Sequence, residues 1–195
     1  MSCWQAWKKS FCTALFVGLV STQATAQVTP VLSITATPDP GISGSQVTLN
    51  VRITGVVDLF AWQFSLAFNP AVMQAVSGSQ GSFLTSLGTT SYSPGVIDNS
   101  AGKVNFAYSA LFGPGPGASG TGILANMTFN AISVGSSALT FSDVLFLNAN
   151  LDAIGLQVNN RSLTVSPIPE PTTALLLVAG LAGVGALRLR KMQAA

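Results

Sequence analysis

The sequence predicts an all-β protein whose main domain is an antiparallel jelly-roll β-sandwich. Short stretches alternate apolar and polar residues with a period of two, which is the pattern of half-buried strands. Clusters of Gly, Pro, Asn and Asp separate these stretches. Between residues 27 and 166 we find no sustained helical period, apart from one expected helical turn at Pro70–Ala75. Many short strands with regular turns are typical of sandwiches and jelly rolls.

About eight or nine strands are expected from these stretches and turns. The clearest alternation places Val47, Leu49, Val51 and Ile53 on one side of a strand. Antiparallel sheets of this kind pack one apolar face inward and leave the other face polar. The strands identified by their pattern are Leu32–Ala36, Val47–Ile53, Phe60–Phe68, Val104–Tyr108, Ile123–Phe129, Ala138–Phe141, Val144–Leu147 and Ser162–Val165.

The stretch Phe60–Phe68 carries four aromatic side chains on one face, so we expect it at the centre of the core. Burying each large apolar side chain stabilises the fold by roughly 1.5–3 kcal/mol. A core position is therefore favoured for Trp62 over a role in stacking on sugar rings. If the domain does bind sugars, Trp62 and Tyr92 are the aromatics expected to contact the ligand.

Residues 1–26 have the anatomy of a secretory signal peptide. Lys8 and Lys9 supply the positive start, and Phe11–Val20 supplies the apolar segment. Ala24 and Ala26 then form an A-x-A cleavage site, so the mature chain is expected to begin at Gln27. The alternative is an N-terminal membrane anchor, but ten apolar residues are too few to span a bilayer. Both cysteines, at positions 3 and 12, lie in this segment, so no disulfide is expected in the mature chain.

The C-terminal segment, residues 167–195, predicts a short transmembrane helix. An uncharged apolar run extends from Ala174 to Leu187. As a helix it would rise about 21 Å, against a bilayer core of roughly 30 Å. Snorkelling of Arg188 would extend it, and the basic residues behind it would hold the extreme C-terminus in the cytoplasm. A buried core helix is the alternative, but a run that is apolar all round and ends in cations favours the membrane.

This tail resembles the PEP-CTERM sorting segment of Gram-negative bacteria. The match consists of the triplet Pro169, Glu170 and Pro171, the apolar run, and the basic residues Arg188, Arg190 and Lys191, in that order. The resemblance implies recognition by a membrane-embedded exosortase, cleavage near the triplet, and release or attachment outside the inner membrane. A GPI-type tail is the alternative, but the basic end after the apolar run argues against it.

The segment 27–166 is long enough for one domain with its own core. Its charge is slight, because five of the eight basic residues lie in the two ends of the chain. Such a domain lacks the basic footprint of a nucleic-acid-binding protein. The charged residues of the segment are Arg52, Lys103, Arg161, Asp39, Asp58, Asp98, Asp143 and Asp152.

The residue types exclude most catalytic chemistry, so we expect no catalytic residues and no cofactor. The sequence contains no histidine, which removes Ser-His-Asp and Cys-His catalysis and nearly all zinc sites. A glycosidase pair of Asp143 and Asp152 is conceivable, but each reads more simply as a turn residue. A calcium site from these two residues and the carbonyls of Asn148–Asn150 stays open, without the usual calcium-loop pattern to support it.

The domain also resembles a cohesin domain, a nine-stranded jelly-roll sandwich. The resemblance covers Val31–Val165, and the stretches Val47–Met73 and Gly120–Phe129 carry it most specifically. It implies binding of dockerin modules in polysaccharide-degrading assemblies. Families of carbohydrate-binding modules share the same architecture.

Together these features predict an exported, non-enzymatic surface or extracellular-matrix binding protein. Its expected partners are the Sec machinery, an exosortase, and a dockerin-like protein or exopolysaccharide. It would be anchored transiently in the inner membrane and then reach the cell surface, matrix or biofilm. A carbohydrate-binding module is the main alternative, and a structural matrix component is a third. A flat apolar face favours a protein partner, whereas a line of exposed aromatic rings favours sugars.

Overall fold

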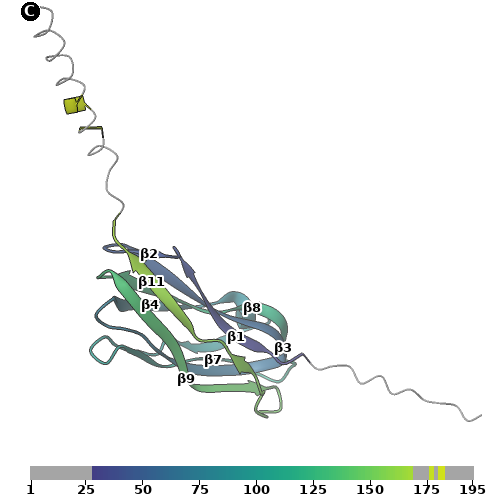
Figure 1. Ribbon diagram of the computed structural model, residues 1–195. Coiled ribbons are helices and arrows are strands. Elements are labelled where there is room, and N and C mark those ends of the chain that lie inside the picture. Colours follow the sequence, from purple (N-terminus) through teal and green to yellow (C-terminus); the bar gives the residue numbers. More distant parts are fainter. Residues whose placement is uncertain (1–27, 169–175, 178–179, 183–195) are drawn as a thin grey trace, which may run out of the picture.

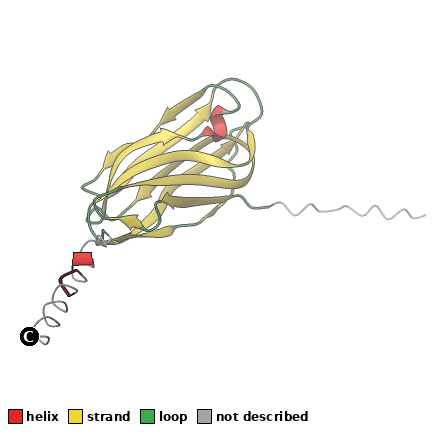
Figure 2. Cartoon of the chain, turned by 90° about the horizontal axis from the view of Figure 1, so that it is seen from above, coloured by secondary structure: helices red, strands yellow, loops and turns green. Residues whose placement is uncertain are grey.

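The fold is a two-layered sandwich of mainly antiparallel strands, with parallel pairings only for the two-residue strands Gly41–Ile42 and Gln157–Val158 among the described residues. The computed structural model describes residues 28–168, 176–177 and 180–182. Figure 2 shows the strands in two facing layers, with the short helix Ser82–Thr85 near one end of the sandwich. The elements are β1 (Val31–Thr37), β2 (Gly41–Ile42), β3 (Gln46–Ala67), β4 (Met73–Gln80), α1 (Ser82–Thr85), β5 (Thr90–Ser93), β6 (Val96–Asp98), β7 (Lys103–Leu111), β8 (Ala118–Ala131), β9 (Gly135–Asn148), β10 (Gln157–Val158) and β11 (Arg161–Ser166).

The long strand β3 takes part in both layers. Its first half lies between β1 and β8 in a layer ordered β10-β1-β3-β8-β4. Its second half lies between β9 and β7, in a layer ordered β2-β11-β9-β3-β7. Strands β5 and β6 pair with the outer edge of β7. The long strand therefore joins the two layers covalently, as the path of the chain in Figure 1 shows.

The strand changes layer through a bend at Gly55–Asp58, where its register with β8 shifts twice. Gly55 and Asp58 have positive φ angles of 70° and 59°. Glycine adopts this conformation freely, and Asp tolerates it better than most residues. The buried side chains step by three here, through Ile53, Val56 and Leu59 to Trp62, instead of by two. We call this end of the sandwich the bend end.

The opposite end is the one at which the chain leaves the domain, and we call it the exit end. There Ser166 pairs with Ile42 in a parallel contact between β11 and β2. The N-terminal strand is split in two, because β1 pairs with β3 in one layer and β2 pairs with β11 in the other. An ion pair between Arg161 and Asp39 joins β11 to the connection between β1 and β2. The N-terminal segment therefore connects the two layers at this edge of the sandwich.

The core lies between the layers and is aromatic at its centre. Trp62 stacks on Phe64 with ring centres 5.2 Å apart, and Phe141 meets Phe64 edge to face at 5.3 Å. Phe68 and Phe129 make a second edge-to-face pair at 5.1 Å. Such pairs add about 0.5–1.5 kcal/mol beyond the burial itself. The expectation that Phe60–Phe68 lies at the centre of the core is confirmed, although Phe60 itself is only half-buried.

Several expected boundaries were wrong. The stretches Val47–Ile53 and Phe60–Phe68 belong to one strand, and Ala138–Phe141 and Val144–Leu147 form a second continuous strand. The expected helical turn at Pro70–Ala75 is a turn that ends where β4 begins, at Met73. The pattern also missed the two-residue strands β2 and β10, and it missed β4, β5, β6 and α1. Their residues are rich in Ser, Gly and Thr and show little alternation.

The bend is held by the carboxylate of Asp58. One carboxylate oxygen accepts the N–H of Gly117 at 2.6 Å, and the other accepts the N–H of Ala149 at 3.2 Å. The N–H of Asp58 donates to the hydroxyl of Ser119 at 2.9 Å. A Cβ on Gly117 would lie 2.5 Å from the Asp58 carbonyl, so only glycine permits this approach. One side chain thus joins the bend to two loops that are distant in sequence.

We predict that Asp58→Ala lowers the free energy of unfolding of domain 28–168 by about 2–3 kcal/mol. The change removes two hydrogen bonds to a charged acceptor and leaves a positive φ angle to a residue that disfavours it. Asp58→Asn, which keeps one acceptor and tolerates the angle, should lose less. The matched control is Asp152→Ala, whose carboxylate makes one long contact, 3.4 Å from the Asn148 amide. Urea denaturation measures the free energy of unfolding of the three variants. Equal losses for Asp58→Ala and Asp152→Ala would refute the role of Asp58.

Candidate binding face

Trp62, one of the two aromatics named for ligand contact, lies in the core. Its side chain is 2% exposed and is covered by the stacked ring of Phe64 and the tilted ring of Tyr92. A sugar would need an open ring face, which this position does not offer. The core position that sequence reasoning favoured for Trp62 is therefore the one in the structure.

Tyr92 is half-buried at the outer edge of the same layer. It pairs with Ser109 of β7, and its ring centre lies 6.4 Å from that of Trp62. Its hydroxyl is buried without a hydrogen-bond partner, and burial raises the pKa of Tyr92. Beside it in the fold, the Gln80 amide donates to the hydroxyls of Thr90 and Ser109 at 2.8 and 2.7 Å. This polar cluster joins β4 of one layer to β5 and β7 of the other.

Bulges in β7 and β9 decide which residues of the second layer point outward. Each strand has one extra residue opposite β3, and Phe106 and Asp143 in these bulges have φ angles of 52°. The hydroxyl of Ser65 accepts the N–H of Phe106 at 3.1 Å, which fixes the bulge in β7. Beyond each bulge, the side chains that would have pointed into the core point outward, and those that would have pointed outward point into the core. The alternation by which the strand Val104–Tyr108 was expected places Val104, Phe106 and Tyr108 on one face, and this is wrong, because only Val104 is buried.

The reversal produces an outward face across β7, β3 and β9 that is largely apolar. Two cross-strand rows form it, one with Ala61 at its centre and one with Gln63. Tyr108 and Leu145 are 40% and 44% exposed, and Phe106 is 54% exposed beside them. We call this surface the outer apolar face; its residues are Ala61, Gln63, Phe106, Tyr108, Ala110, Leu145 and Leu147.

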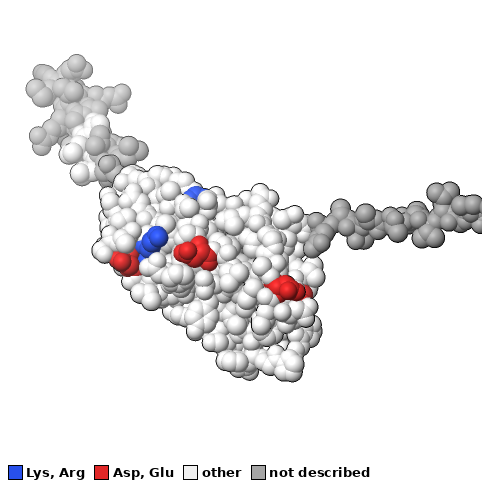
Figure 3. All heavy atoms as spheres, turned by 90° about the horizontal axis from the view of Figure 1, so that it is seen from below, with Lys and Arg blue, Asp and Glu red and all other residues white. Residues whose placement is uncertain are grey.

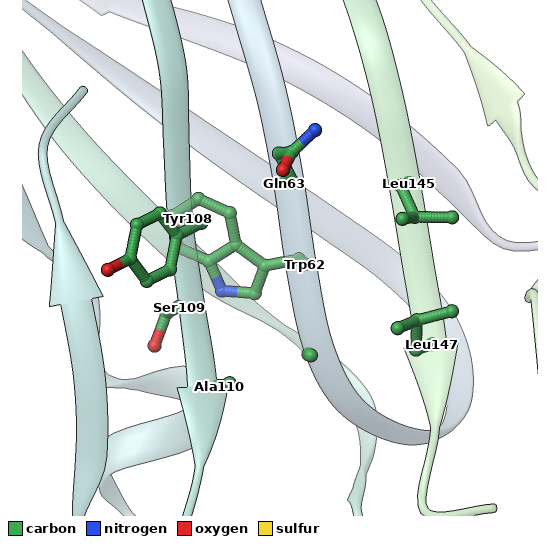
Figure 4. Close-up of a pocket in the computed structure, with 8 residues that line it drawn as sticks. Trp62, Gln63, Tyr108, Ser109, Ala110, Leu145 and Leu147 are labelled. Atoms are coloured by element: carbon green, nitrogen blue, oxygen red, sulfur yellow. The ribbon is translucent and has the colours of Figure 1, made fainter. Parts of the chain in front are cut away.

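A shallow pocket of about 160 Å³ lies in this face. Figure 4 shows Leu145 and Leu147 on one strand and Tyr108 and Ala110 on another, with Gln63 between them. The amide of Gln63 donates to the backbone carbonyl of Asp143 at 3.5 Å. A pocket this small and open suits a protruding side chain of a partner better than a whole small-molecule ligand.

Charged groups are sparse over the domain. Figure 3 shows few charged groups on the side of the domain that it draws, with one basic group beside an acidic group and wide uncharged surface between the others. The carboxylate of Asp143 accepts from the neighbouring Ser142 hydroxyl, and Asp152 approaches the amide of Asn148. The side-chain oxygen of Asn148 accepts the N–H groups of Asn150 and Asp152, both at 2.9 Å. The contacts of Asn148 and Asp152 are those of turn residues, as the sequence suggested, whereas Asp143 lies in the bulge of β9 and not in a turn.

No group of three His, Cys, Asp or Glu side chains that could hold a metal occurs among the described residues. The calcium site suggested at Asn148–Asn150 stays a prediction. The signal cleavage residues, Ala24 and Ala26, lie outside the residues that the structure describes. So do the sorting residues, which are Pro169, Glu170, Pro171, Arg188, Arg190 and Lys191.

The tail is described only in part. Residues 176–177 and 180–182 have helical backbone. In the described part of the chain, no helix reaches the length and apolar content that crossing a membrane requires. The transmembrane helix expected over 174–187 falls largely outside the described residues.

Comparison with known proteins identifies two families. The cohesin domain model matches residues 31–165, and the model of the PEP-CTERM protein-sorting motif matches residues 167–191. No curated protein matches the chain.

Solved structures of cohesins share the fold. The second type II cohesin module of the ScaA scaffoldin of Acetivibrio cellulolyticus is 17% identical, with a TM-score of 0.62 over 72% of this chain and 99% of that one. A type II cohesin from a cohesin–X-dockerin complex of the same organism is 16% identical, with a TM-score of 0.61 over 70% and 99%. A non-cellulosomal cohesin of Archaeoglobus fulgidus is 18% identical, with a TM-score of 0.54 over 69% and 91%.

We predict that polysaccharide leaves the tryptophan fluorescence of domain 28–168 unchanged, because Trp62 is its one tryptophan and is buried. Acrylamide should quench it weakly for the same reason. The control is Phe112→Trp, at a position that is exposed, which should add a component that acrylamide quenches strongly. A saturable change of Trp62 emission on adding polysaccharide would instead place a sugar at this ring.

Proposed function

Since the chain belongs to the cohesin family, we propose that it is an exported, non-enzymatic module that docks a protein partner on its outer apolar face. The observation that carries the proposal is this face itself. It combines exposed apolar side chains with a shallow pocket on rigid, paired strands. Protein interfaces have such apolar centres, whereas an exposed face of this kind is otherwise unfavourable in water.

The chemistry of the face defines the partner. Tyr108 and Leu145 are the side chains best placed to act as anchors, because both are exposed and border the pocket. The pocket has no charged residue in its lining, so complementary charge has little part in recognition there. A partner with an uncharged, apolar contact surface fits best.

A dockerin-like module is the partner class that the family favours. The similar Acetivibrio cellulolyticus structures include a type II cohesin in a cohesin–X-dockerin complex and a cohesin in complex with the Cel5 dockerin. At identities of 16% and 19%, these relatives support the fold and suggest the class of partner.

The two ends of the chain supply the route of export in this proposal. The Sec machinery would export the chain, and residues 169–191 would hold it in the inner membrane of a Gram-negative bacterium. An exosortase would then process the tail near Pro169 and pass the domain to the cell surface or matrix. The match of the sorting motif to residues 167–191 supports this route.

Carbohydrate binding is the second candidate function, and one observation favours it. Phe106 and Tyr108 are both exposed along β7, and Phe112 is exposed just beyond its end. Aligned rings can stack on successive sugars. Their neighbours on the outer apolar face are mainly Ala and Leu, which offer sugar hydroxyls few hydrogen bonds, so we favour the protein partner.

We predict that Leu145→Glu reduces capture of a discrete secreted protein from the host by about tenfold or more. A buried, unpaired charge at an apolar interface costs several kcal/mol. The matched control is Val76→Glu on β4 of the other layer, since Val76 is about as exposed as Leu145. A pull-down with domain 28–168 measures the capture.

Tyr108→Ala separates the two functions when it is tested beside Leu145→Glu. Loss of protein capture in both variants supports docking on the outer apolar face. Retention of exopolysaccharide that depends on Tyr108 but not on Leu145 would support the sugar alternative. Protein capture that Leu145→Glu leaves intact would remove the proposed docking face.

The sorting proposal predicts that a chain ending at Ile168 is released from the membrane. The truncation removes the triplet, the apolar run and the basic residues together. A chain ending at Lys191 is the control, because it keeps the whole motif that the comparison matches. Fractionation of cells measures the distribution. If the chain ending at Ile168 fractionates with membranes as the control does, the tail has no sorting role.

A further inference from the structure

The folded domain ends almost at the sorting motif. Ser166 is still part of the sandwich, because it pairs with Ile42 and its carbonyl accepts the N–H of Ser43 at 2.9 Å. Only Pro167 and Ile168 separate it from Pro169, the first residue of the triplet. Two residues of extended chain span about 7 Å. The exit end of the sandwich is therefore tethered close to whatever surface holds the tail.

The exit end presents exposed aliphatic side chains beside this tether. Ile132 and Val134, in the turn between β8 and β9, are 44% and 54% exposed, and Ile168 is exposed as well. The turn is fixed, because the N–H groups of Ile132 and Ser133 both donate to the carbonyl of Val72. Exposed aliphatic groups held at a lipid interface lose contact with water.

Hydrogen bonds place the turn and the chain exit at the same end. The N–H of Gly44 donates to the carbonyl of Ala131 at 2.7 Å, directly before Ile132. Gly44 follows Ser43, which bonds to Ser166. Figure 1 agrees, since the described chain leaves beside β2 and β11, at the opposite end from its start.

The charged groups at the exit end balance one another, because Lys103 is the register partner of Asp98 and Arg161 pairs with Asp39, so the described part of this end carries no net charge that would repel a lipid surface. Lys103, at the start of β7, is exposed and suits an anionic headgroup. The carboxylate of Asp98 accepts hydrogen bonds inside its own turn, from the Ser100 hydroxyl at 2.6 Å and from the N–H groups of Ser100 and Ala101. These hydrogen bonds lower the pKa of Asp98, the largest effect being that of the Ser100 hydroxyl.

We propose that the exit end of the sandwich rests on the phospholipid surface of the membrane before the tail is processed. Ile132, Val134 and Ile168 lie at the level of the headgroups, and the bend end points away from the bilayer. The inference rests on the proposed membrane attachment of the tail. The bend end also has exposed aliphatics, such as Val57 and Leu151, so the tether and not hydrophobicity alone selects the exit end.

Site-specific fluorescence tests this orientation. The chain from Gln27 on has no cysteine, so single cysteines can be placed at Ile132, Val134 and, as the control, Leu151. Each carries a nitrobenzoxadiazole dye, and the chain with its tail is reconstituted into vesicles of phosphatidylethanolamine and phosphatidylglycerol. We expect the dye at positions 132 and 134 to shift to the blue and to brighten at least twofold. The dye at position 151 should keep the emission spectrum that it has on the isolated domain 28–168 in buffer without lipid or detergent.

The outcomes separate this inference from the proposal beneath it. Vesicle flotation first reports whether the tail attaches the chain. If the chain floats and the dyes at positions 132, 134 and 151 behave alike, the orientation is wrong while the attachment stands. If the chain does not float, the attachment and the orientation are both refuted. Quenching by lipids labelled at the headgroup level gives a second reading that does not depend on dye brightness.

Discussion

The fold depends on the passage of one strand through both layers. Because β3 contributes to each layer, the position of its first half fixes that of its second half. The passage is possible only because the backbone adopts positive φ angles at Gly55 and Asp58. Asp58 stabilises this bend by accepting hydrogen bonds from Gly117 and Ala149. A chain with no disulfide expected outside its first 26 residues thus holds its layers together through covalent continuity, core packing, the Asp58 carboxylate and the hydrogen bonds of Gln80.

The candidate site depends on a second constraint, the bulges in β7 and β9. One extra residue in each strand turns Tyr108 and Leu145 outward and keeps Ala107 and Phe146 inside. Without these bulges the same sequence would bury Tyr108 and Leu145 and would expose their neighbours Ala107 and Phe146. Ser65 takes part directly, since its buried hydroxyl accepts the N–H of Phe106. The surface is therefore a product of strand pairing and not of composition alone.

This dependence explains how much could be predicted from the sequence. The sandwich, the inward side of Val47–Ile53 and the central position of Trp62 follow from period-two alternation, because those residues lie in regular ladders. The outer apolar face does not, because the alternation of Val104, Phe106 and Tyr108 looks regular until its partner strand is known. The edge strands β4, β5 and β6 escaped detection because each places only one or two side chains in or against the core, namely Met73 and Ala75, Tyr92, and Ile97, which is too few to show an alternation. The continuity of β3 and β9 escaped detection because the bend at Gly55–Asp58 and the bulge at Asp143 interrupt the alternation without ending the strand.

The proposed site of attachment and the proposed docking pocket lie toward opposite ends of the sandwich. The tail leaves at the exit end, whereas the pocket of the outer apolar face lies just beyond the bend, since Ala61 follows Leu59 by two residues. A domain held by its exit end would therefore present Leu147 and Ala110 on the side away from its attachment. A partner could bind there while the chain is still attached, and the same geometry would persist after transfer to another anchor near Pro169. If a partner docks on the outer apolar face as proposed, the bend in β3, which fixes the direction of the second layer, also sets the direction from which that partner approaches.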